Sequence, residues 1–137
     1  MKDSLTPAEA VEMLTHVCDG MIASEPLLTD ADRAIGDGDH GIGIKRGFEA
    51  AKEALGEGHE TLDAAFKAVG MAMISSMGGA SGAVFGTLFR NGGKALAGSG
   101  SLDGAALGAF LNEGLEGVMK RGGAKPGDKT IIDALDP

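Results

Sequence analysis

The sequence contains no tryptophan, no tyrosine and a single cysteine, Cys18, among its 137 residues. With one cysteine, no disulfide can form within the chain, and the apolar neighbours of Cys18 predict a buried thiol rather than a reactive one. Basic residues are also few, since 12 lysines and arginines face 20 aspartates and glutamates, which gives a net charge of −8. This acidic balance argues against nucleic acid or an anionic membrane as the main partner.

Long hydrophobic runs are absent as well. No stretch is apolar and long enough to span a bilayer, and the N-terminal residues lack the apolar core of a signal peptide. We therefore expect a cytoplasmic protein. The length suits a single domain, residues 1–137, with a hydrophobic core of its own.

Strand patterns are missing too, because apolar and polar residues alternate nowhere in the chain. Apolar residues instead recur at helical spacing between short polar breaks, which is typical of an all-α bundle. A capping box at Thr6–Glu9 and a cap at Thr61 predict two helix starts, and Ser101 is expected to cap another. The expected helices cover residues 7–25, 26–34, 41–55, 61–76, 81–96, 101–120 and 131–135.

Glycine, in contrast, is abundant with 24 residues, and one glycine-rich segment is strongly acidic. This segment, Gly36-Asp37-Gly38-Asp39-His40-Gly41, closely follows Asp32. Carboxylates so close together repel each other unless a cation or hydrogen-bond donors hold them, and Mg²⁺ prefers such oxygen ligands together with phosphate. A helix that begins near His40 would point its free N–H groups at an anion. The segment therefore predicts a site where carboxylates, a metal ion and phosphate meet.

Of two other interpretations of the acidic segment, one stays open and one is excluded. A solvated acidic turn stays open as an alternative, since Asp-Gly pairs are ordinary turn residues. A calcium loop of the EF-hand type is excluded, because Ile42 stands where that loop needs glycine and Phe48 stands where it needs glutamate.

Two further glycine-rich segments alternate with the expected helices. Gly78–Gly82 precedes a helix and could hold phosphates, although a close crossing of two helices explains it about equally well. Residues 121–130 form a basic, glycine-rich loop. Asp128 separates Gly127 from Lys129, so the Walker pattern is not met, but we still expect this loop to contact a nucleotide. Alternate loops of an up-and-down bundle share one end, and we therefore expect the three glycine-rich segments to lie together.

Taken together, these motifs resemble the L-type, nucleotide-binding subunit of dihydroxyacetone kinases. The resemblance rests on Ile35–Gly41, Arg46–Phe48, Ser75–Gly82, Phe85–Thr87 and Pro126–Thr130, whose order and spacing agree across nearly the whole chain. It implies an antiparallel helical barrel that holds ATP or ADP with two Mg²⁺ ions at one end. Because family members continue further, it also implies that this chain lacks a C-terminal part and has about six of eight helices.

The resemblance implies roles for individual residues. Asp32, Asp37 and Asp39 would bind the metal ions, and Asp37, Asp39 and His40 would act in catalysis. The nucleotide would be lined by His40, Gly41, Ile42, Gly43, Ala80, Ser81, Gly122, Thr130 and Ile131. One departure concerns Gly43, where the family commonly has asparagine, so that a side-chain contact to phosphate is lost or replaced by the backbone.

The function implied by the resemblance is phosphoryl transfer to dihydroxyacetone, bound by a separate K subunit, in glycerol metabolism. The phosphoryl donor would be ATP or, where ADP stays bound as a cofactor, a protein of the phosphotransferase system, and a homodimer or hetero-oligomer is expected. Alternatives are a kinase subunit for another small ketose and a nucleotide-dependent regulatory partner of a transcription factor. The nucleotide domain of fatty acid kinases fits less well, because it usually has threonine where this chain has His40.

Overall fold

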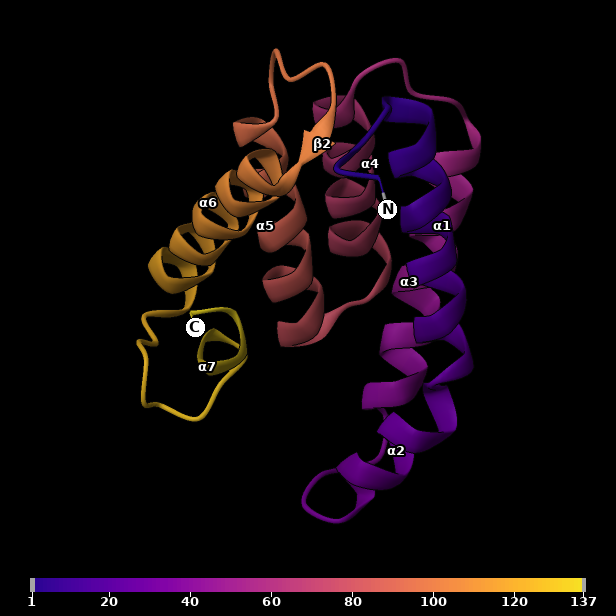
Figure 1. The fold of residues 1–137 in the computed structure, drawn as a ribbon. Coiled ribbons are helices and arrows are strands. Elements are labelled where there is room, and N and C mark those ends of the chain that lie inside the picture. The colour runs from indigo at the N-terminus through magenta and orange to yellow at the C-terminus, as the bar shows by residue number, and fades with distance from the viewer. Residues whose placement is uncertain (1, 137) are drawn as a thin grey trace.

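The computed structural model describes residues 2–136, which form a curved row of helices (Figure 1). The elements in chain order are β1 (Ser4–Leu5), α1 (Pro7–Ala23), α2 (Glu25–Arg33), α3 (His40–Gly56), α4 (Leu62–Ser76), α5 (Gly79–Ala95), β2 (Leu102–Asp103), α6 (Gly104–Gly122) and α7 (Ile132–Leu135). This architecture confirms the predicted all-α class. The longer helices α1 to α6 also agree with the six that were expected, and α7 is the single further turn.

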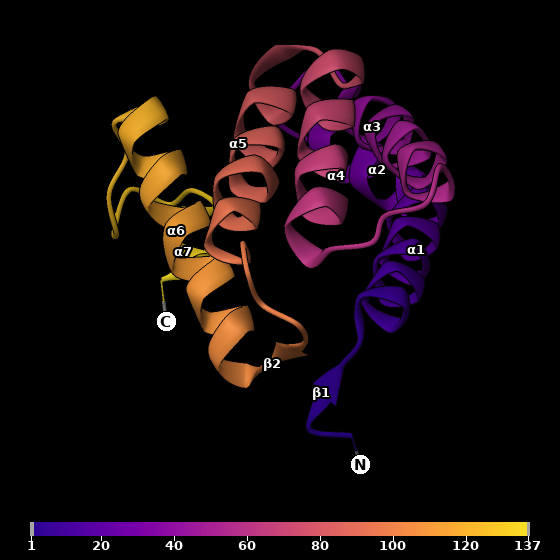
Figure 2. The ribbon, with the colours of Figure 1, turned by 90° about the horizontal axis from the view of Figure 1, so that it is seen from above.

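Helices that follow each other along the chain lie side by side. Both α1 and α2 pack against α3, which packs against α4, and α5 and α6 continue the row. Viewed from above, the row bends into an arc with α1 towards one end and α6 towards the other (Figure 2). The contact between α4 and α5 depends on glycine, because a Cβ atom at Gly70 would lie 2.8 Å from the carbonyl oxygen of Gly86.

A small two-stranded sheet is the one element type that the sequence did not predict. Strand β1 pairs with β2 in antiparallel fashion, with Ser4 opposite Asp103 and Leu5 opposite Leu102. Strands of two residues are too short to produce a visible alternation of apolar and polar residues. The prediction that Ser101 caps α6 is wrong, because the side chain of Asp103 accepts the N–H of Ala106 at 2.8 Å.

Two other helix starts were predicted correctly. Thr6 and Glu9 form the expected capping box at the start of α1, in which the Thr6 N–H donates to a Glu9 carboxylate oxygen at 3.0 Å. At the start of α4, the hydroxyl of Thr61 accepts the N–H of Ala64 at 3.4 Å. Caps of this kind satisfy N–H groups that lack a partner inside the helix.

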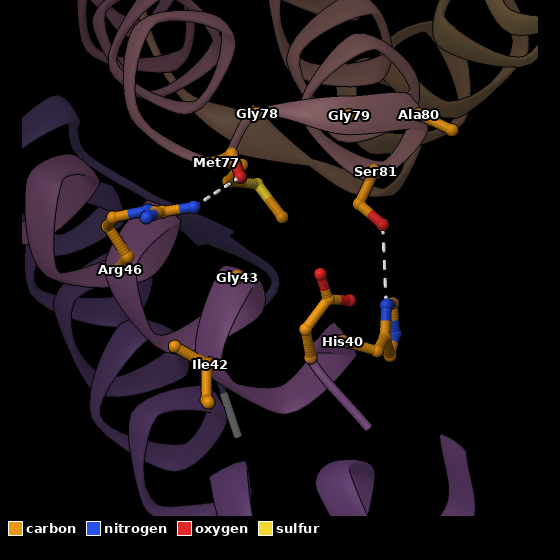
Figure 3. A pocket seen from close by; sticks show the side chains of 10 residues that line it. His40, Ile42, Gly43, Arg46, Met77, Gly78, Gly79, Ala80 and Ser81 are labelled. Atoms are coloured by element: carbon orange, nitrogen blue, oxygen red, sulfur yellow. Dashed lines mark hydrogen bonds between the residues drawn. The ribbon is translucent and has the colours of Figure 1, made fainter. Parts of the chain in front are cut away.

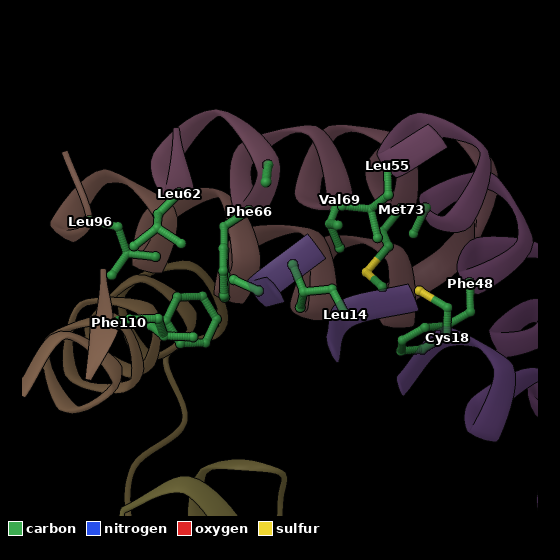
Figure 4. Close-up of a cluster of buried hydrophobic side chains, with 14 of the residues drawn as sticks. Leu14, Cys18, Phe48, Leu55, Leu62, Phe66, Val69, Met73, Leu96 and Phe110 are labelled. Atoms are coloured by element: carbon green, nitrogen blue, oxygen red, sulfur yellow. The ribbon is translucent and has the colours of Figure 1, made fainter. Parts of the chain in front are cut away.

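The main core lies between the helices of the row and contains Phe66, Val69 and Met73 (Figure 4). The ring of Phe66 from α4 meets that of Phe110 from α6 with centroids 4.8 Å apart. Cys18 is buried in the same core with 2% exposure, and burial raises the pKa of its thiol to about 11. The predicted buried thiol is thus confirmed. Among the described residues, none of the helices combines the length and apolarity needed to cross a membrane.

Candidate functional site

The three glycine-rich segments meet at one end of the helix row, as the alternation of loops and helices predicted. The first leads into α3, the second leads into α5, and the third joins α6 to α7. A cavity of 330 Å³ is lined by residues from all three, including His40, Ser81 and Thr130. Two further cavities adjoin this one and share lining residues with it.

The carboxylates of Asp32, Asp37 and Asp39 gather at this end of the molecule. Each residue offers an oxygen, and these oxygens all lie within 4.8 Å of one another. Asp32 lies in the last turn of α2, where its Oδ2 atom accepts the N–H groups of Gly38 at 2.9 Å and of His40 at 3.2 Å. These two hydrogen bonds wrap the acidic loop around the Asp32 carboxylate.

Two glycines make this loop possible. A Cβ atom at Gly36 would overlap Oδ1 of Asp32, so the glycine leaves room for that oxygen. Gly38 has a φ of +79°, in the left-handed region that other residues rarely adopt. The alternation of glycine and aspartate in the sequence is therefore a requirement of the backbone path as well as of the carboxylates.

The charges of this cluster repel each other in the absence of a cation. The pKa of Asp39 is raised, first by a side-chain hydrogen bond with Asp37 and next by the negative charge of Asp37. The backbone N–H of Asp39 also donates to Asp37 Oδ1 at 3.3 Å. A divalent cation would relieve this repulsion, and an all-oxygen donor set is the one that Mg²⁺ prefers. The three residues therefore fit a magnesium site.

A cavity of 340 Å³ opens beside Asp39 (Figure 3), and we call it the polar cavity because its lining is more polar than that of the two adjoining cavities. One wall comes from the first turns of α3, and the opposite wall comes from residues 77–81 at the start of α5. The Nδ1 atom of His40 and the hydroxyl oxygen of Ser81 lie 3.3 Å apart, within hydrogen-bond distance. The full lining consists of Asp39, His40, Ile42, Gly43, Arg46, Met77, Gly78, Gly79, Ala80 and Ser81.

The start of α5 gives this cavity the character of an anion site. The cap residue Gly78 and the first helical residue Gly79 have φ values of +69° and +58°, a backbone path that favours glycine. The first N–H groups of a helix have no partner within it and carry the positive end of the helix dipole. Gly79, Ala80 and Ser81 thus bring such groups to the wall of the cavity.

A second, apolar cavity of 290 Å³ lies on the other side of Ala80, between α5, α6 and α7. Its side chains are mostly aliphatic, with Val84 from α5, Val118 from α6 and Ile132 from α7. The complete lining is Ala80, Ala83, Val84, Val118, Arg121, Gly122, Ala124, Thr130, Ile131 and Ile132. A flat apolar group next to a polar cavity is what this arrangement can hold.

Asp133 holds the loop that brings Thr130 and Ile131 to these cavities. Its two carboxylate oxygens accept the N–H of Gly127 at 2.6 Å and the N–H of Thr130 at 2.8 Å. These hydrogen bonds lower the pKa of the Asp133 carboxyl. Lys129 within the loop has a φ of +59°, an uncommon conformation for a residue with a side chain.

Eight of the nine residues expected to line a nucleotide border one or more of the three cavities: His40, Ile42, Gly43, Ala80, Ser81, Gly122, Thr130 and Ile131. Gly41 differs, because it is buried against α2, where a Cβ atom would overlap the hydroxyl of Thr29 and lie 2.7 Å from its backbone nitrogen. The expectation that Gly41 lines a nucleotide stays a prediction, and the structure shows that this glycine allows α3 to approach α2.

Sequence reasoning gave no site role to Arg46, Val84, Val118 and Asp133. Arg46 belongs to a recognised motif, yet only the fold brings its guanidinium to the polar cavity. The two valines looked like ordinary core residues, and nothing in their spacing distinguishes a cavity wall from a packed core. The role of Asp133 could have been predicted, because this residue follows Thr130 by three positions in the pattern of a helix cap.

Comparison with known proteins agrees with this geometry. The chain matches the family model described as the DAK2 domain over residues 34–137. It is 45% identical over 115 residues to the ADP-binding subunit of PEP-dependent dihydroxyacetone kinase 1 from Listeria innocua, which covers 83% of this chain and 58% of the relative. It is 38% identical over 135 residues to the corresponding ADP-binding subunit from Escherichia coli, with 98% of this chain and 64% of the relative covered.

A solved structure is similar as well. The crystal structure of the dihydroxyacetone kinase from C. freundii in complex with AMP-PNP and Mg²⁺ superimposes with a TM-score of 0.79 and 27% sequence identity, covering 95% of this chain and 24% of that chain. The present chain spans 58% and 64% of the length of the two curated relatives. The expectation that a C-terminal part is missing stays a prediction.

Proposed function

Since the chain belongs to the DAK2 domain family, we propose that it is the nucleotide-binding part of a dihydroxyacetone kinase and takes part in phosphoryl transfer to dihydroxyacetone. One observation carries this proposal. The cluster of three carboxylates borders a polar cavity built on two helix N-termini, and an apolar cavity adjoins it. A bound nucleotide needs these three environments side by side, one for its metal ion, one for its phosphates and one for its base.

Each part of ATP or ADP has a matching environment. The phosphates would occupy the polar cavity, where the N–H groups of residues 79–81 and the side chains of His40 and Ser81 are available. The base would lie in the apolar cavity between Val84, Val118 and Ile131. The naming of the curated relatives as ADP-binding subunits supports this assignment.

Asp32, Asp37 and Asp39 would hold magnesium, for which two ions are proposed. Bound Mg²⁺ would neutralise charge on the phosphates. The chain's own contribution is mostly placement and electrostatics, because its helix N-termini and hydroxyl groups orient the phosphates before any bond changes. His40 would touch a phosphate or orient Ser81, and a role as general base is not proposed.

The acceptor would be bound by another protein. We propose a K subunit that presents dihydroxyacetone, a phosphotransferase-system protein as one source of the phosphoryl group, and a hetero-oligomer formed in the cytoplasm. The relatives named as PEP-dependent kinases support the phosphotransferase route over direct use of ATP. A kinase for another small ketose and a regulatory partner of a transcription factor remain the alternatives.

The proposal is tested by isothermal titration of the chain with ADP and with ATP, each with and without Mg²⁺. We expect Mg²⁺-dependent binding that Asp37→Asn abolishes, because the amide keeps the shape but removes a charged ligand. The matched control is Asp30→Asn, since Asp30 is exposed and bonded to Arg33 at 3.3 Å outside the carboxylate cluster. Equal binding by both variants, or no binding by the folded wild-type chain, would refute the nucleotide site.

Substrate and partner need a second measurement. Phosphorylation of dihydroxyacetone should require a dihydroxyacetone-binding subunit, the present chain and either ATP or a phosphotransferase protein. Replacement of dihydroxyacetone by erythrulose separates the alternative ketose. Nucleotide binding without turnover under any of these conditions, together with capture of a transcription regulator, would favour the regulatory alternative.

A further inference from the structure

Arg46 links the two walls of the polar cavity. It lies on α3, and its Nη2 atom donates a hydrogen bond to the carbonyl oxygen of Met77 on the opposite wall at 2.9 Å (Figure 3). Met77 is the C-cap residue directly after α4 and leads into the glycine segment before α5. A side chain from one wall therefore holds the backbone of the other.

Gly47, the residue after Arg46, also contacts Met77. Gly47 is buried against Met77, and a Cβ atom at position 47 would overlap the Met77 side chain. Met77 itself is buried, with 3% exposure. The side chain of Met77 packs into the space left by Gly47, and its carbonyl oxygen accepts a hydrogen bond from the Arg46 guanidinium. These two contacts hold the guanidinium in place.

The guanidinium keeps most of its hydrogen-bonding capacity. Arginine has five N–H donors and stays charged at all physiological pH values. The contact with Met77 uses one nitrogen, and within residues 2–136 no carboxylate comes within ion-pair distance of Arg46. The cavity that it lines also contains the Asp39 carboxylate, so an anion entering there needs a compensating positive charge.

From these contacts we propose that Arg46 is a further nucleotide-binding residue, whose guanidinium is oriented by the Met77 carbonyl and binds a phosphate group of the nucleotide. This inference rests on the proposed function. Gly43 lies one helical turn before Arg46 and lines the same cavity, where a Cβ atom at this position would lie 3.7 Å from the carbonyl oxygen of Met77.

The experiment compares ADP with adenosine, which has the same base and sugar but no phosphate. Titrations with ADP and Mg²⁺ are followed by calorimetry, and titrations with adenosine are followed by the NMR amide signal of Ile131, which allows millimolar affinities to be measured. For Arg46→Gln we expect ADP binding to weaken by about ten- to a hundredfold, the usual effect of a lost charged hydrogen bond, with adenosine binding unchanged. Arg46→Lys should restore part of the ADP affinity.

Lys52→Gln is the matched control, because it removes the same charge from the same helix. Lys52 bonds to Asp19 at 2.6 Å and lines none of the three cavities. An equal loss for ADP and adenosine would mean that Arg46 only supports the fold, and unchanged ADP binding would also overturn the inference. If the wild-type chain does not bind ADP, the result overturns the proposed function together with the role of Arg46.

Discussion

The Nδ1 atom of His40 lies 3.3 Å from the hydroxyl oxygen of Ser81, although 41 positions separate the two residues in the sequence. His40 begins α3 and Ser81 lies in the first turn of α5. This contact therefore joins two helix N-termini, each of which favours an anion. The pair marks the place where the acidic loop and the second glycine segment become one site.

Removal of the Ser81 hydroxyl should weaken nucleotide binding moderately. A neutral hydrogen bond contributes about 0.5–1.5 kcal/mol, so Ser81→Ala is expected to lower the ADP affinity by about two- to tenfold in calorimetric titration. Ser76→Ala is the control, since the Ser76 hydroxyl donates to the Ala72 carbonyl of its own helix at 2.7 Å. Equal losses in both variants would contradict a specific role for the contact with His40.

Introduction of asparagine at position 43 should strengthen ADP binding. A Cβ atom at Gly43 would lie 3.7 Å from the carbonyl oxygen of Met77, which is an ordinary contact. Gly43→Asn places an amide donor in the polar cavity, and we expect affinity for Mg²⁺ and ADP to rise by about two- to tenfold. Gly43→Ala adds the Cβ atom without the amide, so an identical gain in that variant would refute the amide contact.

The close approach of α4 and α5 should make Gly70 intolerant of a side chain. A Cβ atom there would lie 2.5 Å from the backbone nitrogen of Arg90 and 2.8 Å from the carbonyl oxygen of Gly86. Backbone atoms cannot move aside individually, so Gly70→Ala is expected to lower the free energy of unfolding by about 1–3 kcal/mol. Urea denaturation followed by circular dichroism measures this change.

A glycine in open space provides the contrast to Gly70. Gly108 lies within α6, and a Cβ atom there would meet nothing within 4 Å. Gly108→Ala should therefore raise the free energy of unfolding by about 0.5–1 kcal/mol, because alanine loses less backbone entropy in a helix. Similar changes in both variants would contradict the packing of α4 against α5 described above.

The loop before α7 should depend on pH through Asp133. The N–H groups of Gly127 and Thr130 lower the pKa of this carboxyl below its ordinary value of 3.8. A lowered pKa in the folded state means that the hydrogen bonds stabilise the loop fully above about pH 4 and lose this effect as the pH falls through the folded pKa. An NMR titration of the Gly127 and Thr130 amide signals should give a midpoint below 3.8.

Two outcomes would decide that prediction. In Asp133→Asn the same amide signals should lose the titration step and exchange their hydrogens faster, because the amide oxygen is a weaker acceptor than a carboxylate. A midpoint at or above 3.8 in the wild-type chain would contradict the hydrogen-bonded carboxylate.

The helices could be predicted well because their signals are local. Thr6, Glu9 and Thr61 act within their own turn of helix, and the apolar spacing of each helix repeats within a few residues. The strands could not be predicted, because Ser4 pairs with Asp103, which lies far away in the sequence. Asp103, a residue of the same pairing, caps α6 in place of the predicted Ser101.

The sequence by itself determined the helical class and the kinds of group that the candidate site offers, because carboxylates, glycines and caps act through spacings of a few residues. Only the tertiary structure decided which side chains share a cavity. It turned Gly41 towards α2, brought Arg46 to Met77, and placed Val84 and Val118 in one apolar wall. These relationships depend on how whole helices pack, and a residue's own neighbours in sequence carry no record of the surface that its helix will meet.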